Sequence, residues 1–147
     1  MDESDLALRN LTYLQFVALG RAPSVFEVGS EAGLDVAHVR AGWRRLHDMH
    51  ALVLDPAKFE LRMANPFSAI PTPHRVQADG RWWYANCAWD AFGILGALHS
   101  DGLIQTACPD CGEPITVEVV SEKPDAPDLV FHCLEPAHRW WEDIAFT

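Results

Sequence analysis

Three prolines in the stretch NPFSAIPTPHRV constrain the fold of this chain more than any other feature. Pro66, Pro71 and Pro73 lie within eight residues of one another, and each lacks the backbone N–H that a helix or an interior strand would use. Such a segment favours an extended conformation that crosses between structured regions. We therefore expect two parts, residues 1–64 and residues 65–147, within one small domain or as two very small ones.

The part before the prolines predicts a small helical module. Apolar residues recur at helical spacing over residues 6–19. Ser24 followed by Glu27 is the capping-box pattern of a second helix, and Asp35 opens a third amphipathic pattern. The residues that follow predict two short strands around a turn, which would supply a wing. Residues 1–64 therefore predict a three-helix, winged-helix-like module.

The part after the prolines alternates between strand-like and helix-like patterns. RWWYA predicts a short strand, and Asn86 is placed to cap a helix from Cys87 to about Leu98. GLIQTA and EPITVEVV predict strands that flank the turn CPDC, and LVFHCL at residues 129–134 predicts another. The whole chain is therefore predicted to be α+β, with the N-terminal module followed by a small mixed β-sheet and a packed helix.

The charge balance disfavours several classes of partner. The chain has 11 Lys and Arg against 21 Asp and Glu, a formal net charge of −10, which suits neither nucleic acid nor anionic membranes. Arg40, Arg44 and Arg45 could contact phosphate from the third helix, but that helix also carries a packed apolar face. No uncharged run reaches the ~18 residues of a membrane helix, and the acidic start lacks signal-peptide features. We expect a cytoplasmic location, with the four cysteines as thiols or metal ligands.

Cys87 and Asp90 are the first candidates for chemistry. Cys87 lies at a predicted helix start, where free backbone N–H groups and the helix dipole favour a thiolate. Asp90, three residues later, would lie beside it on one helical face. Two acidic groups so placed disfavour double ionisation and can share a proton. The dipole contributes only about 0.3–1 kcal/mol, so a desolvated pair can outweigh it. The result is a soft nucleophile beside a proton donor. The alternative is a structural cysteine in the core and an aspartate that bonds the amides of the first helical turn.

The turn CPDCG, with Cys108 and Cys111, has the spacing of a zinc knuckle or a redox dithiol. Zinc requires two further ligands, and the downstream candidates are His132, Cys133 and His138, of which Cys133 and His138 would complete a set. The absence of a surrounding βαβ pattern weakens the redox interpretation. A turn with two inert thiols is the remaining alternative.

Several runs resemble the alkylmercury (organomercurial) lyase family: NPFSAIPTPHRV, RWWYANCAWDAFGI, CGEPI and PAHRWWEDIAFT. The resemblance covers roughly residues 60–147, and the family carries a winged-helix-like module before its catalytic region. It implies that Cys87 is the thiolate that binds the mercury of R–Hg⁺, while Asp90 handles the proton delivered to the leaving carbon. This chemistry suits the residues, since mercury(II) is soft and prefers thiolate, and a carbanion-like leaving group needs a positioned acid.

The resemblance also implies a second, downstream cysteine, whose position in this chain is open. By alignment it follows the segment matching RWWEDIAFT, where this sequence reaches Thr147. Either Cys133 or the Cys108–Cys111 pair takes this role, or the C-terminus is incomplete, or the chain is not a competent lyase. Cys108 also resembles a cysteine that is structural in the family.

The resemblance implies no bound cofactor, with Hg²⁺ as the bound product and an organomercurial or other soft organometal as the substrate. Low-molecular-weight thiols or a mercuric reductase would then remove the Hg²⁺. Two alternatives stay open. One is a zinc-containing winged-helix metal sensor or transcriptional regulator that uses CPDC, and the other is a non-catalytic soft-metal-binding homologue.

Overall fold

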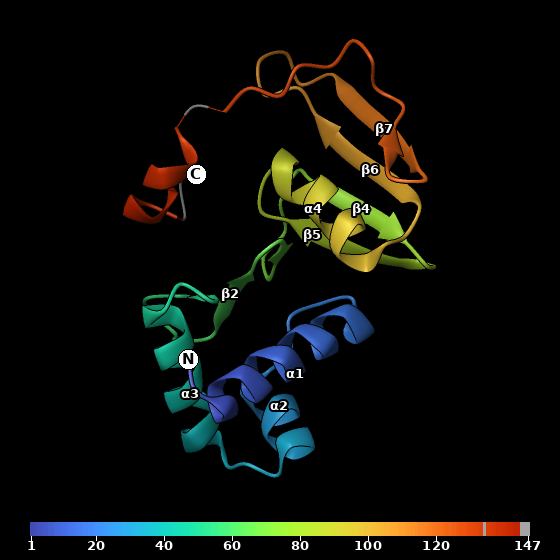
Figure 1. Cartoon of the computed structure of the whole chain (residues 1–147). Helices are drawn as coiled ribbons and strands as arrows, with labels where there is room; N and C mark the ends of the chain where they lie inside the picture. Colours follow the sequence, from blue (N-terminus) through green and yellow to red (C-terminus); the bar gives the residue numbers. More distant parts are fainter. Residues whose placement is uncertain (134, 145–147) are drawn as a thin grey trace.

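The computed structural model describes residues 1–133 and 135–144 (Figure 1). Its elements follow in the order α1 (Glu3–Leu19), α2 (Val25–Ala32), α3 (Val36–Asp48), β1 (Val53–Leu54), β2 (Leu61–Ala64), β3 (Phe67–Ser68), β4 (Arg75–Ala78), β5 (Arg81–Ala85), α4 (Ala88–Leu98), β6 (Gly102–Ala107), β7 (Pro114–Val120), β8 (Lys123–Pro124) and the 3-10 helix η1 (Ala137–Glu142). The first three helices gather at one end of the molecule, and α4 lies against the sheet at the other (Figure 1). The predicted α+β class is confirmed.

Capping residues explain where the N-terminal helices begin. Ser24 Oγ accepts from the N–H of Glu27 at 3.2 Å, and the Glu27 carboxylate accepts from the N–H of Ser24 at 2.8 Å, so the predicted capping box is present. Asp35 accepts from the N–H of His38 at 2.8 Å at the start of α3. These contacts satisfy backbone donors that have no partner within the helix.

The strands form one sheet in the order β1-β2-β3-β5-β4-β6-β7-β8. Every described pairing is antiparallel, so the sheet is not mixed as the sequence predicted. Helix α4 connects β5 to β6, but β4 lies between these two strands and separates them. They therefore never pair directly, and the crossover creates no parallel ladder.

The predicted strand at 129–134 is wrong for residues 129–133, which have no regular secondary structure, while residue 134 lies outside the described residues. The edge of the sheet beside β7 is already paired with β8. The chain then leaves the sheet, and Phe131 contacts the exposed side chain of Trp89 on α4, with ring centroids 5.8 Å apart.

Aromatic residues join the N-terminal helices to the sheet. Phe16 of α1 lies 5.2 Å from Phe67 of β3 between ring centroids, and Trp83 of β5 donates from Nε1 to the Phe16 carbonyl at 3.3 Å. All three side chains are buried. The two parts expected on either side of residue 64 thus share one sheet and one core, while the boundary itself stays a prediction.

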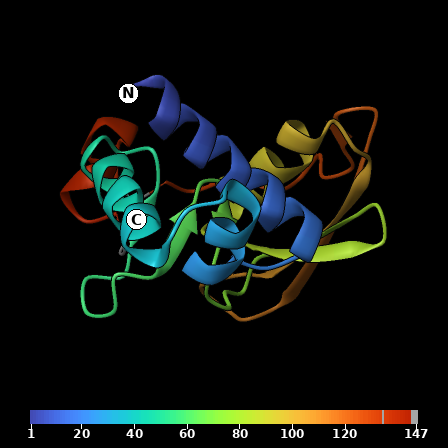
Figure 2. The same ribbon diagram turned by 90° about the horizontal axis from the view of Figure 1, so that it is seen from below.

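The C-terminal segment returns to the N-terminal helices. Trp141, which lies in η1, stacks on His50 just after α3, with ring centroids 4.0 Å apart and planes 6° from parallel. Figure 2 shows this segment beside α3. Within the described residues, no helix is long and apolar enough to cross a bilayer.

Candidate functional site

Cys87 occupies the N-cap position of α4, one residue later than the predicted cap Asn86. Its backbone is extended, with φ −146° and ψ 179°, and its carbonyl accepts from the N–H of Ala91 at 3.1 Å. No side-chain hydrogen bond caps the helix. The sulfur therefore remains available at the helix start, where it is half-buried.

Asn86 holds the carboxylate of Asp90 in place. Its Nδ2 donates to Asp90 Oδ2 at 3.0 Å and also approaches the Pro66 carbonyl at 3.2 Å and Asn65 Oδ1 at 3.3 Å. Its own carbonyl oxygen Oδ1 is buried without a hydrogen-bond partner in the structure. Sequence reasoning treated Asn86 only as a helix cap and missed this role, for which its spacing of four residues from Asp90 was the available signal.

Burial raises the pKa of the Cys87 thiol and of the Asp90 carboxyl above their ordinary values. For Cys87, the backbone N–H of Asp90 opposes this rise, whereas the charge of Asp90 adds to it. For Asp90, the Asn86 amide and the Cys87 thiol oppose the rise. Desolvation therefore outweighs the effect of the helix start on Cys87, as the sequence allowed for a desolvated pair, because burial penalises the charged form more strongly. The site favours a thiol next to a protonatable carboxyl.

Tyr13 of α1 contacts Asn65, which belongs to the segment that Asn86 also contacts. Its hydroxyl lies 3.1 Å from the Asn65 carbonyl and 3.3 Å from the Ala51 carbonyl. Burial raises the pKa of Tyr13, the guanidinium of Arg9 opposes that rise, and the charge of Asp90 adds to it. A helix of the N-terminal module thus supports the segment that positions Asp90, a contribution that sequence reasoning did not anticipate.

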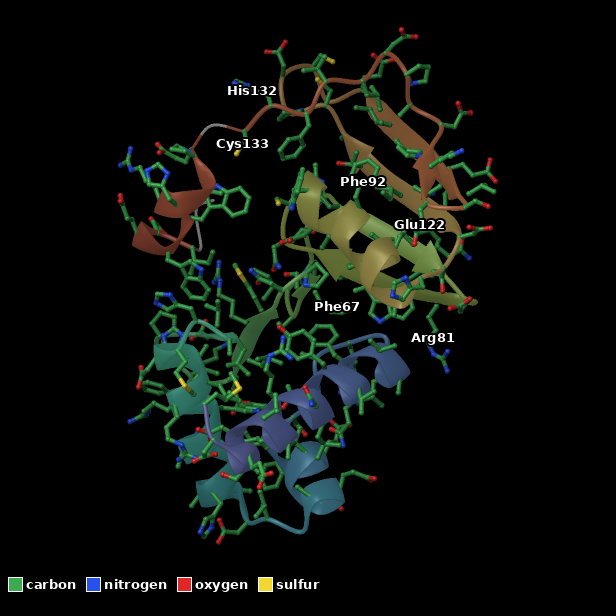
Figure 3. All side chains as sticks on the ribbon, viewed as in Figure 1. Phe67, Arg81, Phe92, Glu122, His132 and Cys133 are labelled. Atoms are coloured by element: carbon green, nitrogen blue, oxygen red, sulfur yellow. The ribbon has the colours of Figure 1, made fainter. Side chains whose placement is uncertain are left out.

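Cys133 lies close enough to Cys87 to influence it. The charge of a Cys133 thiolate raises the pKa of Cys87, although less than burial does. Cys133 is exposed, and its Sγ donates to the Glu135 carbonyl at 2.9 Å. Figure 3 shows it on the chain segment that passes the start of α4, where the contact between Phe131 and Trp89 anchors that segment. The structure therefore brings Cys133 toward the Cys87–Asp90 pair.

The four residues of the predicted zinc set are not gathered. Cys108 and Cys111 lie in the turn between β6 and β7, whereas Cys133 and His138 lie further along the chain. Within residues 1–133 and 135–144, no group of three or more His, Cys, Asp or Glu side chains is arranged to hold a metal ion. Zinc at the cysteine pair stays a prediction.

The arginines that suggested phosphate contacts have partners within the chain. Arg40 pairs with Glu60 at 2.8 Å, and Arg45 pairs with the buried carboxylate of Asp5 at 2.7 Å. The guanidinium carbon of Arg44 lies 4.6 Å from the ring centroid of Phe59. These contacts engage all three cations in the fold, while the low expectation of nucleic-acid binding stays a prediction.

Comparison with known proteins places the site in a family. The profile of alkylmercury lyase (MerB) matches residues 67–147, which include Cys87, Asp90 and Cys133. This chain belongs to the alkylmercury lyase family. The matched region begins at β3, so family membership rests on the sheet, on α4 and on the C-terminal segment.

Two curated alkylmercury lyases, from Bacillus cereus and from Clostridium butyricum, are each 26% identical to this chain over 106 residues. The match covers 72% of this chain and 46% of either relative, so the chain spans about half the length of these relatives. Among solved structures, the mercury-bound form of MerB2 is similar, with a TM-score of 0.65 and 26% identity. That similarity covers 86% of this chain and 60% of the other.

Proposed function

We propose that this chain cleaves carbon–mercury bonds by protonolysis, with Cys87 as the mercury-binding thiolate and Asp90 as the group that handles the proton. The observation that carries the proposal is the Cys87–Asp90 pair itself, half-buried at the start of α4 and fixed by Asn86. Membership of the alkylmercury lyase family supports the same reaction.

The raised pKa values of both groups fit the order of steps. When R–Hg⁺ binds, the Cys87 sulfur forms a bond to mercury and its S–H proton passes to the Asp90 carboxylate. The protonated carboxyl then delivers this proton to the carbon as the C–Hg bond breaks. The bonding electron pair stays with carbon, so R–H leaves and Hg²⁺ remains on sulfur. Nothing is oxidised or reduced, so the step requires no resident cofactor.

Hg²⁺ on a single thiolate needs a second soft ligand, because mercury(II) prefers sulfur to oxygen or nitrogen. We assign this ligand to Cys133, since its thiolate is close enough to raise the pKa of Cys87. Low-molecular-weight thiols or a mercuric reductase would then remove the metal by ligand exchange. The substrate class is an organomercurial or a related soft organometal.

The direct test is incubation of the protein with methylmercury or phenylmercury and excess thiol, with release of methane or benzene measured by gas chromatography. We expect hydrocarbon release from the wild type and none from Cys87→Ala. Cys111→Ala serves as a control, since it also removes a thiol but lies in the β6–β7 turn. A wild type that releases no hydrocarbon where an established lyase turns over would remove the proposal. Release that survives Cys87→Ala would remove the assignment of the site.

A further inference from the structure

The turn that carries Cys108 and Cys111 is fixed at both ends by backbone hydrogen bonds. Cys108 N–H donates to the Glu113 carbonyl at 2.9 Å, and Gly112 N–H donates to the Cys108 carbonyl at 2.9 Å. Gly112 has φ 75°, a left-handed conformation that residues with a Cβ adopt at a cost. The longest paired stretch of the sheet, between β6 and β7, leads directly into this turn. The backbone is therefore preorganised before any ligand arrives.

The two thiols lie three residues apart in this one turn. Backbone N–H groups of Cys111 and Asp110 point toward the Cys108 sulfur, and the Cys111 side chain contacts it as well. Together these contacts hold the pKa of Cys108 below its ordinary value. Both thiols are free, and Cys111 is exposed. The turn thus holds two free thiols three residues apart, with Cys111 open to solvent.

The ligand number selects the class of ion. Structural zinc sites use four ligands in a tetrahedron, but among the described residues no group of three or more His, Cys, Asp or Glu side chains is arranged to hold a metal ion. Soft d¹⁰ cations such as Hg²⁺ and Cu⁺ prefer thiolates, and they form stable complexes with only two sulfurs in a linear arrangement. A pair of thiols without a third ligand suits such a cation.

We propose that Cys108 and Cys111 form a second metal site, which binds a two-coordinate soft cation, Hg²⁺ above all, independently of Cys87. Binding replaces two S–H bonds with two S–Hg bonds and releases two protons to solvent. The proposal does not rest on the lyase reaction, because inorganic Hg²⁺ is its ligand. The proposal gives a role to the C-x-x-C motif, which carbon–mercury cleavage at α4 does not use.

The test uses the full chain with Cys87→Ser and Cys133→Ser, which leaves Cys108 and Cys111 as the remaining cysteines. Titration with mercuric chloride in the presence of excess glutathione is followed by native mass spectrometry and by sulfur-to-mercury charge-transfer absorbance. We expect one Hg²⁺ per chain, loss of that ion when Cys108→Ser or Cys111→Ser is added, and two sulfur neighbours by X-ray absorption. Circular dichroism verifies that each variant is folded.

A matched control keeps the number of thiols but changes their spacing. In the Cys87→Ser, Cys133→Ser background, Cys111→Ser is combined with Glu113→Cys at an exposed position of the same turn. We expect this variant to lose Hg²⁺ to glutathione. Equal retention by the control, or no Hg²⁺ on the parent variant, would overturn the site. Stoichiometric Zn²⁺ that Hg²⁺ does not displace would also overturn it.

Discussion

Asn86 donates a hydrogen bond from its side-chain amide to Oδ2 of Asp90 at 3.0 Å, one turn along the same segment of chain. The same nitrogen lies near oxygens of the Asn65–Pro66 segment. The amide therefore ties the carboxyl of α4 to the connector before β3. The hydrogen bond from Asn86 lowers the pKa of Asp90, whereas burial raises it.

Asn86→Leu should raise the pKa of Asp90 further, since the substitution removes a contact that lowers it while burial remains. Loss of a residue that orients a reacting group typically costs about 10–100-fold in activity, and we expect a decrease of that order in lyase kcat/KM. The ascending limb of the pH profile should also move to higher pH, because Asp90 must be ionised to accept the proton of Cys87. NMR of the Asp90 carboxyl carbon measures the pKa directly. Asn86→Gln retains the amide and should recover part of the effect, whereas an unchanged Asp90 pKa in the Leu variant would contradict the role.

Asp90→Asn should lower the pKa of Cys87, because the charge of Asp90 raises it. The variant should hold more thiolate at neutral pH and react faster with iodoacetamide. It should nevertheless lose about 10²–10⁴-fold in hydrocarbon release, the usual contribution of a general acid. Thiolate absorbance against pH checks the first effect, and gas chromatography checks the second. Asp110→Asn, in the remote β6–β7 turn, is the control. Slower alkylation of the Asp90→Asn variant would contradict the expected effect of the Asp90 charge on the pKa of Cys87.

Trp89→Ala should release the segment that carries Cys133. The contact between Trp89 and Phe131 is of a kind worth about 0.5–1.5 kcal/mol, and residues 129–133 have no regular secondary structure to hold them otherwise. We expect faster hydrogen exchange in this segment and weaker retention of Hg²⁺ between Cys87 and Cys133. Phe92→Ala, at another exposed aromatic residue of α4, is the control. Identical exchange in both variants would mean that other contacts anchor the segment.

Glu27→Gln should destabilise the fold at neutral pH. Hydrogen bonds from Arg21 and Ser24 lower the pKa of Glu27 from 4.5 to about 2. Because the folded-state pKa lies below the unfolded value, this stabilisation is fully present above pH 4.5 and is lost as the pH falls toward 2. Thermal unfolding of wild type and variant should differ at pH 7 and converge at low pH. Glu31→Gln, exposed on the same helix, should have a smaller effect at pH 7. A difference that persists at the lowest pH would exclude Glu27 ionisation as its source.

Features that depend on local patterns were predictable from the sequence. The spacing from Ser24 to Glu27, the strand RWWYA and the strands that flank CPDC are all present as predicted. Local periodicity could not reveal that β4 lies between β5 and β6, because strand order depends on pairings between distant residues. The same limit explains the wrong strand at residues 129–133, which stay exposed without a strand partner while Phe131 contacts Trp89 of α4.

The candidate site was predictable where it follows spacing along one helix, as it does for Cys87 and Asp90. Whether the pair is desolvated, and the pKa of Cys87 therefore raised, was not predictable, because burial depends on what the rest of the chain packs around the sulfur. Tyr13 lies 52 residues from Asn65 in sequence, so no motif connects them. Such supporting contacts become visible only when the fold brings α1 to the connector.

The shared core of Phe16, Phe67 and Trp83 has a consequence for how the protein is produced and how it fails. A fragment that starts at residue 65 would expose two large aromatic side chains and the unpaired edge of β3, a surface prone to aggregation. The N-terminal helices therefore cover an aggregation-prone surface of the C-terminal part. Heating should melt both halves in a single transition, and mercury bound at α4 should protect residues of α1 from proteolysis.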